Sequence, residues 1–319
     1  MTKKGKKQGG MILTSKRGKM ESPWKRGSFP GDTVAGGIFL TILAACCFGL
    51  LPLFAKTAYA GGFNPYSFSL FRVVFTAIFL FAILKYQNKS LVIEKKDVIT
   101  LFKASFFGYY LMMVTLCVSY TLMATGLATV LHFVYPVATM AGAVIIYKEK
   151  TNVVQIGAMA ISLVGIYFLV GLESQGSLNV TGFTLALSSG FFYAYYILTV
   201  SHGTIKTMNS FVVIFYITLF NSITLLVTCI LMDNLPHQMT PMGFMATVMV
   251  ALVSSVIAMV AFQAGLKKIS ATSATILSTF EVVTSLIAGI ALLGENFSVF
   301  QMMGSTLIMA SVVAVALSE

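Results

Sequence analysis

Long apolar runs separated by short polar stretches follow one another along the chain, from about residue 34 to residue 317. About 20 consecutive apolar residues cross the hydrocarbon core of a bilayer as a helix. The pattern therefore predicts an all-α integral membrane protein with ten transmembrane helices. In chain order the predicted spans are 34–55, 65–86, 104–123, 127–147, 153–171, 180–200, 210–232, 242–266, 271–293 and 297–317.

The chain also repeats itself. Residues 127–149 read LATVLHFVYPVATMAGAVIIYKE, and residues 273–295 read SATILSTFEVVTSLIAGIALLGE, so the apolar stretch and the Glu that ends it are both copied. Internal repeats of membrane-length segments are typical of transporters. We expect two copies of five helices each, the first over residues 32–172 and the second over residues 178–317.

The basic residues predict how the chain lies in the membrane, because Lys and Arg in short loops stay on the cytoplasmic side. Eighteen of them fall in the N-terminal segment or in loops that follow the even-numbered spans, against Lys56 alone on the other side. Both termini should then lie on the cytoplasmic side, and we expect the protein in the cell membrane. Two copies of five spans must run in opposite directions, which makes an inverted repeat. The eighteen are Lys3, Lys4, Lys6, Lys7, Lys16, Arg17, Lys19, Lys25, Arg26, Lys85, Lys89, Lys95, Lys96, Lys148, Lys150, Lys206, Lys267 and Lys268.

Composition agrees with a protein whose main partner is the lipid bilayer, since 57% of the residues are hydrophobic and 10% are charged. Residues 1–31 are polar and basic without an apolar run, and we expect a disordered cytoplasmic tail there. The net charge of +11 lies mostly in this tail and in the orienting loops. It therefore needs no nucleic acid partner to explain it.

Few polar residues interrupt the predicted spans, and an ionisable side chain there is costly unless it faces a cavity or a partner. On the fourth span, Thr129, His132, Tyr135, Pro136 and Thr139 recur at spacings of three and four, so they share one helix face.

The ninth span carries a similar stripe, formed by Thr275, Ser278, Glu281 and Ser285. Inverted repeats place substrate near the midplane between the copies, so these two stripes are the candidate walls of a solute site. Glu281 is the first candidate, because a carboxyl group in an apolar cavity could carry a proton or face a cationic group of the solute. The alternative is a protonated Glu281 that hydrogen-bonds to a neighbouring helix.

Two further ionisable residues have open roles. His132 could titrate near neutral pH or hydrogen-bond across the bundle as a neutral imidazole. Arg72, near the start of the second span, could meet an anionic solute, pair with a carboxylate or extend to the headgroups.

Aromatic residues gather on the third and sixth spans, where rings inside a cavity would suit planar or quaternary-ammonium solutes. Consecutive residues point around a helix, so only some of these rings can face inward. Pro52 and Pro136 should kink the first and fourth spans and could serve as hinges. The aromatic residues are Phe106, Phe107, Tyr109, Tyr110, Phe191, Phe192, Tyr193, Tyr195 and Tyr196.

Other classes of function are disfavoured. The four cysteines lie within predicted spans without CxxC spacing, so we expect packing roles, no metal site and no cofactor. The spans lack the nucleophile with base or the paired carboxylates that an enzyme needs. No GxxxxGK[ST] loop is present, which argues against a nucleotide-driven pump.

The sequence LATVLHFVYPV followed by IIYKEKTNVVQIGAMAISLVGIYFLV resembles the EamA domain of the drug/metabolite transporter superfamily. The resemblance covers about residues 34–317 and implies ten helices, a central cavity, alternating access and export or exchange of small organic solutes. One departure is Val282, where the family often has proline after Glu, and it predicts a straighter ninth span. The matching residues are Lys56, Arg72, Glu149, Gln155 and Gly157, then Glu295, Gln301 and, displaced by one residue, Gly304.

Together these observations predict a gradient-driven transporter of small organic metabolites, such as amino acids or drug-like amphipathic solutes, with protons as a candidate coupling ion. A passive solute channel or a non-transporting membrane receptor is the alternative. Fold-level kinship does not name the solute.

Overall fold

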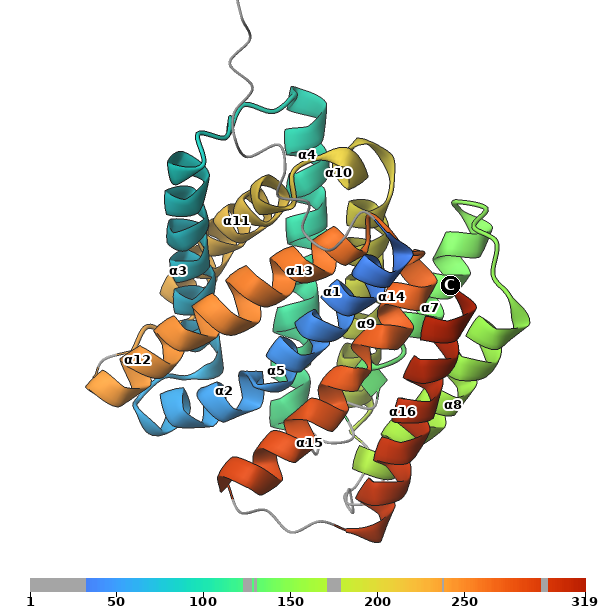
Figure 1. The fold of residues 1–319 in the computed structure, drawn as a ribbon. Helices are drawn as coiled ribbons and strands as arrows, with labels where there is room; N and C mark the ends of the chain where they lie inside the picture. The colour runs from blue at the N-terminus through green and yellow to red at the C-terminus, as the bar shows by residue number, and fades with distance from the viewer. Residues whose placement is uncertain (1–32, 123–127, 129–130, 171–178, 237, 294–297) are drawn as a thin grey trace, which may run out of the picture.

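The computed structural model describes residues 33–122, 128, 131–170, 179–236, 238–293 and 298–319, and within these residues the chain is helical without strands (Figure 1). The predicted tail, residues 1–31, and Thr129 lie outside them. The helical segments are α1 Val34–Gly49, α2 Leu51–Ala60, α3 Pro65–Tyr86, α4 Lys95–Lys103, η2 Ala104–Tyr110, α5 Leu111–Leu122, α7 Tyr135–Ile145, α8 Val153–Val170, α9 Val180–Ser201, α10 Gly203–Thr207, α11 Ser210–Leu231, α12 Pro241–Val250, η4 Ala251–Ile257, α13 Ala258–Gly265, α14 Ala271–Ser278, α15 Phe280–Leu293 and α16 Val299–Ser318.

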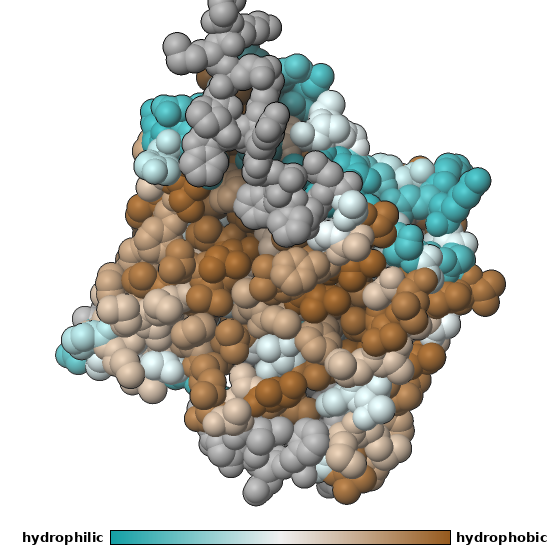
Figure 2. Space-filling model, viewed as in Figure 1, coloured by the Kyte–Doolittle hydropathy of each residue, from teal (hydrophilic) through white to brown (hydrophobic). Residues whose placement is uncertain are grey.

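By length and composition, seven of the described helical stretches could cross a membrane, and three shorter apolar helices accompany them. Figure 2 shows the corresponding surface, a broad apolar region with hydrophilic residues toward its upper end. The prediction of an all-helical membrane protein is confirmed. The seven stretches are Val34–Ala60, Pro65–Tyr86, Lys95–Ser119, Val180–Ser201, Ser210–Leu231, Pro241–Gly265 and Ala271–Gly289, and the shorter helices are Tyr135–Ile145, Val153–Phe168 and Met302–Ser318.

Helix packing follows the repeat. Three contacts join equivalent helices of the two copies: α3 packs on α11, α7 on α14 and α8 on α16. Two further contacts correspond to each other, because α1 packs on α13 of the other copy just as its equivalent α9 packs on α5. The two copies therefore pack against each other through several pairs of helices.

Most loops that carry the lysines meet at one end of the molecule, the upper end in Figure 1. We call this the lysine-rich end and define it by the α3–α4, α7–α8 and α13–α14 connections together with α10. The hydroxyl of Thr204 in α10 donates to Asp97 of α4 at 2.6 Å, and the Lys267 amine donates to the carbonyl of Met208. Burial lowers the pKa of Lys267, and the neighbouring Lys268 lowers it further. Helix α7 ends at this end and α14 begins there, so equivalent segments run in opposite directions.

Local sequence explains the helix boundaries. Asn64 and Ser67 form a capping box ahead of α3, in which each side chain accepts a hydrogen bond from the other residue's backbone N–H. The third span, predicted to begin at residue 104, begins in the structure at Lys95. Hydropathy missed this first part because α4 is amphipathic, burying Leu101 while its lysines remain exposed.

Two π-helical segments, η2 and η4, occupy the middle of the third and eighth spans. The wider turn of a π-helix is uncommon and is frequently found at functional sites. Each segment packs against a helix of the opposite copy, η2 on α11 and η4 on α3. The two π-helices are thus another feature shared by the copies.

Candidate functional site

The candidate site begins with an interruption in the fourth span. A turn at Phe133 and Val134 precedes α7, and Pro136 lies in the first turn of that helix. Proline has no N–H to continue a helix and its ring clashes with the preceding turn, so the interruption falls where the sequence predicts it. Pro52 has the same place in the first turn of α2. The hinge role of both prolines stays a prediction.

The ninth span is also interrupted, which corrects the expectation of a straighter helix. Helix α14 ends at Ser278 and α15 begins at Phe280, with Thr279 between them. Hydroxyl groups replace the missing proline as the cause, because Ser278 donates to the carbonyl of Thr275 and Thr279 to that of Ile276. Such bonds from Ser and Thr to the preceding turn bend helices.

The two interruptions meet in the interior. The Tyr135 hydroxyl lies 2.8 Å from the Ser278 hydroxyl, and both side chains are buried. Since Ser278 donates its proton to the Thr275 carbonyl, Tyr135 is the donor in this contact. The predicted stripes of the fourth and ninth spans are therefore joined directly.

Rings from three helices surround this contact. We define the ring cluster as His132, Tyr135, Tyr193, Tyr196 and Tyr109. Tyr193 lies at its centre, with ring centroids 4.8 Å from Tyr135, 5.8 Å from His132 and 5.9 Å from Tyr196. Tyr109 of η2 extends the cluster, 5.5 Å from Tyr196. These rings provide flat apolar faces with polar edges in the middle of the protein.

His132 is anchored by α9. Its Nδ1 lies 2.9 Å from the hydroxyl of Ser189, which itself donates to the carbonyl of Ala186. The Ser189 proton is thereby used, so His132 Nδ1 carries a proton and donates it. This geometry is the hydrogen bond across the bundle that is one of the two predicted roles of His132.

Glu281 lies inside the bundle, close enough to the phenols of Tyr135 and Tyr193 for their charges to interact. It belongs to the first turn of α15, where the exposed N–H groups of a helix favour a negative charge. Its side chain is partly accessible, whereas every residue of Ala271–Ser278 is buried. The side chains of the ninth span are therefore buried between the lysine-rich end and the interruption, and they are more accessible after it.

Glycine allows α1 to reach Glu281. A Cβ added at Gly49 would lie 2.6 Å from the Glu281 carbonyl oxygen and 2.9 Å from the backbone nitrogen of Ser285. Both are backbone atoms, which cannot yield as a flexible side chain can. Ser285 itself is partly buried beside this contact.

We predict that Gly49→Ala destabilises the folded protein by about 1–3 kcal/mol, the usual cost of overpacking, and displaces Glu281. Thermal unfolding in detergent measures the change. Gly157→Ala is the matched control, because a Cβ there meets no atom within 4 Å. Equal melting temperatures for the two variants would contradict the close approach.

Arg72 lies elsewhere. It is buried, its Nε donates to the Ser255 hydroxyl at 2.6 Å and its Nη2 to the Ser254 carbonyl at 3.2 Å. Both acceptors belong to η4, so Arg72 binds the π-helix of the other copy and does not extend to the headgroups. A role of Arg72 toward an anionic solute stays a prediction.

The remaining predicted residue, Thr139, is fully buried on α7, and its hydroxyl has no hydrogen-bond partner among the described residues. Of the aromatic residues, Tyr193 and Tyr196 face the interior, while Phe191 and Tyr195 on the same helix are exposed. Ser189 was not predicted. Its spacing of four residues from Tyr193 is the signal that would have found it.

Comparison with known sequences now identifies the family. The sequence model of the EamA-like transporter family matches residues 35–171 and 180–317, one match for each copy. The chain belongs to the EamA-like transporter family. An EamA fold is therefore duplicated within it, as the repeat predicts.

A solved crystal structure supports the fold of this EamA protein. The two superimpose with a TM-score of 0.79 over 88% of this chain and 96% of that chain, at 15% sequence identity. Similarity at this identity shows a shared fold. Comparison with curated protein sequences gives no match.

Metal ligands do not gather in the described part of this EamA protein, where no group of three His, Cys, Asp or Glu side chains comes together. Its four cysteines are free thiols, with Cys229 fully buried. The polar groups of the site are thus hydroxyls, one imidazole and one carboxyl group, which can bind a solute by hydrogen bonds, ring contacts and charge.

Proposed function

We propose that this protein is a secondary, gradient-driven transporter that exports or exchanges small organic metabolites, such as amino acids or drug-like amphipathic solutes, by alternating access. Ten helices cross the cell membrane in this proposal, and the lysine-rich end faces the cytoplasm. The observation that carries it is the direct contact of the two interrupted spans, Tyr135 with Ser278. Inverted-repeat transporters bind their solutes at such a meeting of broken helices.

The chemistry of the site favours a solute with a positively charged or planar group. Glu281 supplies the only carboxyl group among the predicted site residues, and Tyr193 with its neighbouring rings supplies aromatic faces. A cation held over aromatic rings gains about 0.5–2 kcal/mol, more when water is excluded. Hydroxyls such as Ser278 would then orient the rest of the solute.

The test has two stages. A thermal-shift screen of the purified protein against organic cations and amino acids selects a ligand, since binding at 100 times Kd raises stability by about 2.7 kcal/mol. Flux of that ligand is then measured in sealed proteoliposomes. We expect flux that saturates with concentration and responds to an imposed gradient. Flux that rises in proportion to concentration would indicate a channel, and binding without flux would indicate a receptor.

A further inference from the structure

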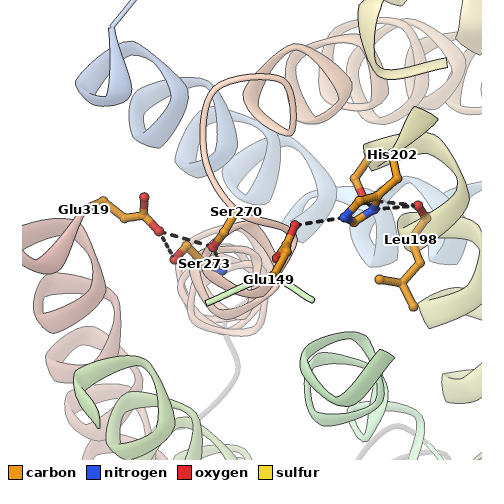
Figure 3. A network of polar contacts seen from close by, with 7 residues as sticks. Glu149, Leu198, His202, Ser270, Ser273 and Glu319 are labelled. Carbon is orange, nitrogen blue, oxygen red and sulfur yellow. Dashed lines mark hydrogen bonds and ion pairs between the residues drawn. The ribbon is translucent and has the colours of Figure 1, made fainter. Parts of the chain in front are cut away.

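The α7–α8 connection of the first copy is tied to the end of α9 in the second copy by one ionisable pair. His202 Nε2 lies 2.9 Å from Glu149 Oε1, and the two side chains are 14% and 19% exposed (Figure 3). The ring of Tyr147 stacks on His202 at 3.7 Å between centroids. The Tyr147 ring and the contact with Glu149 therefore fix the plane of the imidazole.

Hydrogen-bond chemistry fixes the proton on one side of that imidazole. His202 Nδ1 lies 2.9 Å from the carbonyl oxygen of Leu198, and a carbonyl can only accept. Nδ1 also lies 2.9 Å from the Ser201 hydroxyl, which donates its own proton to the same carbonyl. Nδ1 therefore carries a proton. Turning the ring over would place carbon atoms against both the Leu198 carbonyl and Glu149, so the two contacts together set its orientation.

A second proton must then lie between His202 and Glu149. With Nδ1 protonated, a neutral imidazole presents a lone pair at Nε2, and a carboxylate presents only lone pairs as well. A contact of 2.9 Å between them requires one shared proton, whether it is counted as imidazolium with carboxylate or as imidazole with carboxylic acid. Without that proton the two groups repel each other.

A second contact between the copies lies near the first. The amide Nε2 of Gln155 donates to the Ser273 hydroxyl at 2.9 Å and to Glu319 Oε1 at 3.2 Å (Figure 3 draws Ser273 and Glu319). Ser270 and Ser273 also donate to Glu319. The carboxylate of Glu319 accepts its bonds from uncharged donors, so this contact needs no shared proton, in contrast to that of His202 with Glu149.

Buried polar atoms that lack a hydrogen-bond partner mark places that water would hydrate if the lysine-rich end opened. Among the described residues the hydroxyl of Thr272 on α14, the hydroxyl of Thr139 on α7 and Oε2 of Glu149 are buried without a hydrogen-bond partner. Each of these atoms lies on an element that forms the closed side of the site. Hydration of such atoms recovers a desolvation cost, which favours opening once the contacts are released.

We propose that Glu149 and His202 form a proton-binding site that latches the lysine-rich end shut, so that loss of one proton releases it. The closed form keeps the shared proton to a higher pH than the open form does, because the contact is lost without that proton. Raising the pH therefore favours opening, and lowering it favours closure.

Several charged or titratable groups surround Glu149 and His202, and none of those described below shares the proton of the pair. Tyr147 covers the ring, and Lys148 and Lys150, which flank Glu149, are exposed. On α10, which packs against α9, Lys206 is partly exposed, and Thr204 donates to Asp97 of α4.

Thiol labelling tests the latch in the full chain without its solute. The four cysteines are replaced by serine or alanine, and Thr272→Cys reports opening, because its hydroxyl has no hydrogen bond to lose. Ser90→Cys, at an exposed loop position, corrects for the effect of pH on thiol reactivity. We expect the ratio of the two labelling rates to rise by about tenfold between about pH 6 and about pH 8.5.

Two substitutions of Glu149 separate the proposal from a structural role. Glu149→Gln supplies an amide N–H that donates to the neutral imidazole, so labelling should stay slow at every pH. Glu149→Ala removes the contact, so labelling should be fast at every pH. An unchanged pH response in Glu149→Gln, or a flat response with native Glu149, would overturn the latch. The inference rests on the proposed alternating access, but either result would leave the flux experiment to decide transport by itself.

Discussion

Tyr135→Ala is expected to lower the free energy of unfolding by about 3–5 kcal/mol, the usual cost of removing a buried aromatic side chain. Tyr135 is 1% exposed, contacts the rings of His132, Phe133 and Tyr193, and donates to Ser278. Its removal would open a cavity where the two copies meet. Unfolding monitored by circular dichroism in mild detergent measures the loss.

Two controls locate the source of that loss. Tyr135→Phe keeps the ring and removes only the bond to Ser278, so it should cost about 0.5–1.5 kcal/mol. Tyr195→Ala removes a tyrosine that is 41% exposed on the outer face of α9 and should have little effect. A Tyr135→Ala protein as stable as Tyr195→Ala would show that the ring cluster does not hold the copies together.

Glu281→Gln should weaken binding of a cationic solute by about 10- to 100-fold. A hydrogen bond to a charged group contributes about 1.5–3 kcal/mol, and each 1.4 kcal/mol is a factor of ten in affinity. Glutamine keeps the shape of the side chain and removes its charge, so the folded protein should survive. Titration of the purified protein with the ligand found by thermal shift measures the affinity.

The same variant tests coupling to protons. Flux in vesicles with an imposed pH gradient should lose its response to the gradient in Glu281→Gln. Asp233→Asn, which makes the same carboxyl-to-amide change at an exposed position outside the predicted site, is the matched control and should retain that response. Unchanged flux of Glu281→Gln at every pH would remove Glu281 from the coupling role.

The sequence predicts much of the fold because hydropathy and helix signals act locally. The second span agrees with α3, Pro65–Tyr86, since proline and a capping box mark its start and Lys85 its end. The interruption at Pro136 follows from one residue type. The interruption at Thr279 was missed because it depends on several hydroxyls bonding to the preceding turn, which has no single-residue signature.

The site is predicted less completely, because contacts between distant segments depend on packing. The shared helix face selected Tyr135 and Ser278, which meet across the copies, and their role in binding a solute stays a prediction. Arg72 could not be placed from sequence, since its acceptors become available only in the π-helix η4. The pairing of Glu149 with His202 likewise needs the end of α9 to reach the α7–α8 connection.

Alternating access is the central claim, and the distances across the two ends of the protein test it most directly. Spin labels at Lys150 and Thr207 report the lysine-rich end, and labels at Ala60 and Thr181 report the opposite end; all four positions are exposed. Distance distributions in lipid nanodiscs are compared between about pH 5.5 and about pH 8.5, with and without the bound ligand. We predict that the distance between the labels at one end increases as the distance between the labels at the other end decreases. Two pairs that widen together, or that never change, would contradict it.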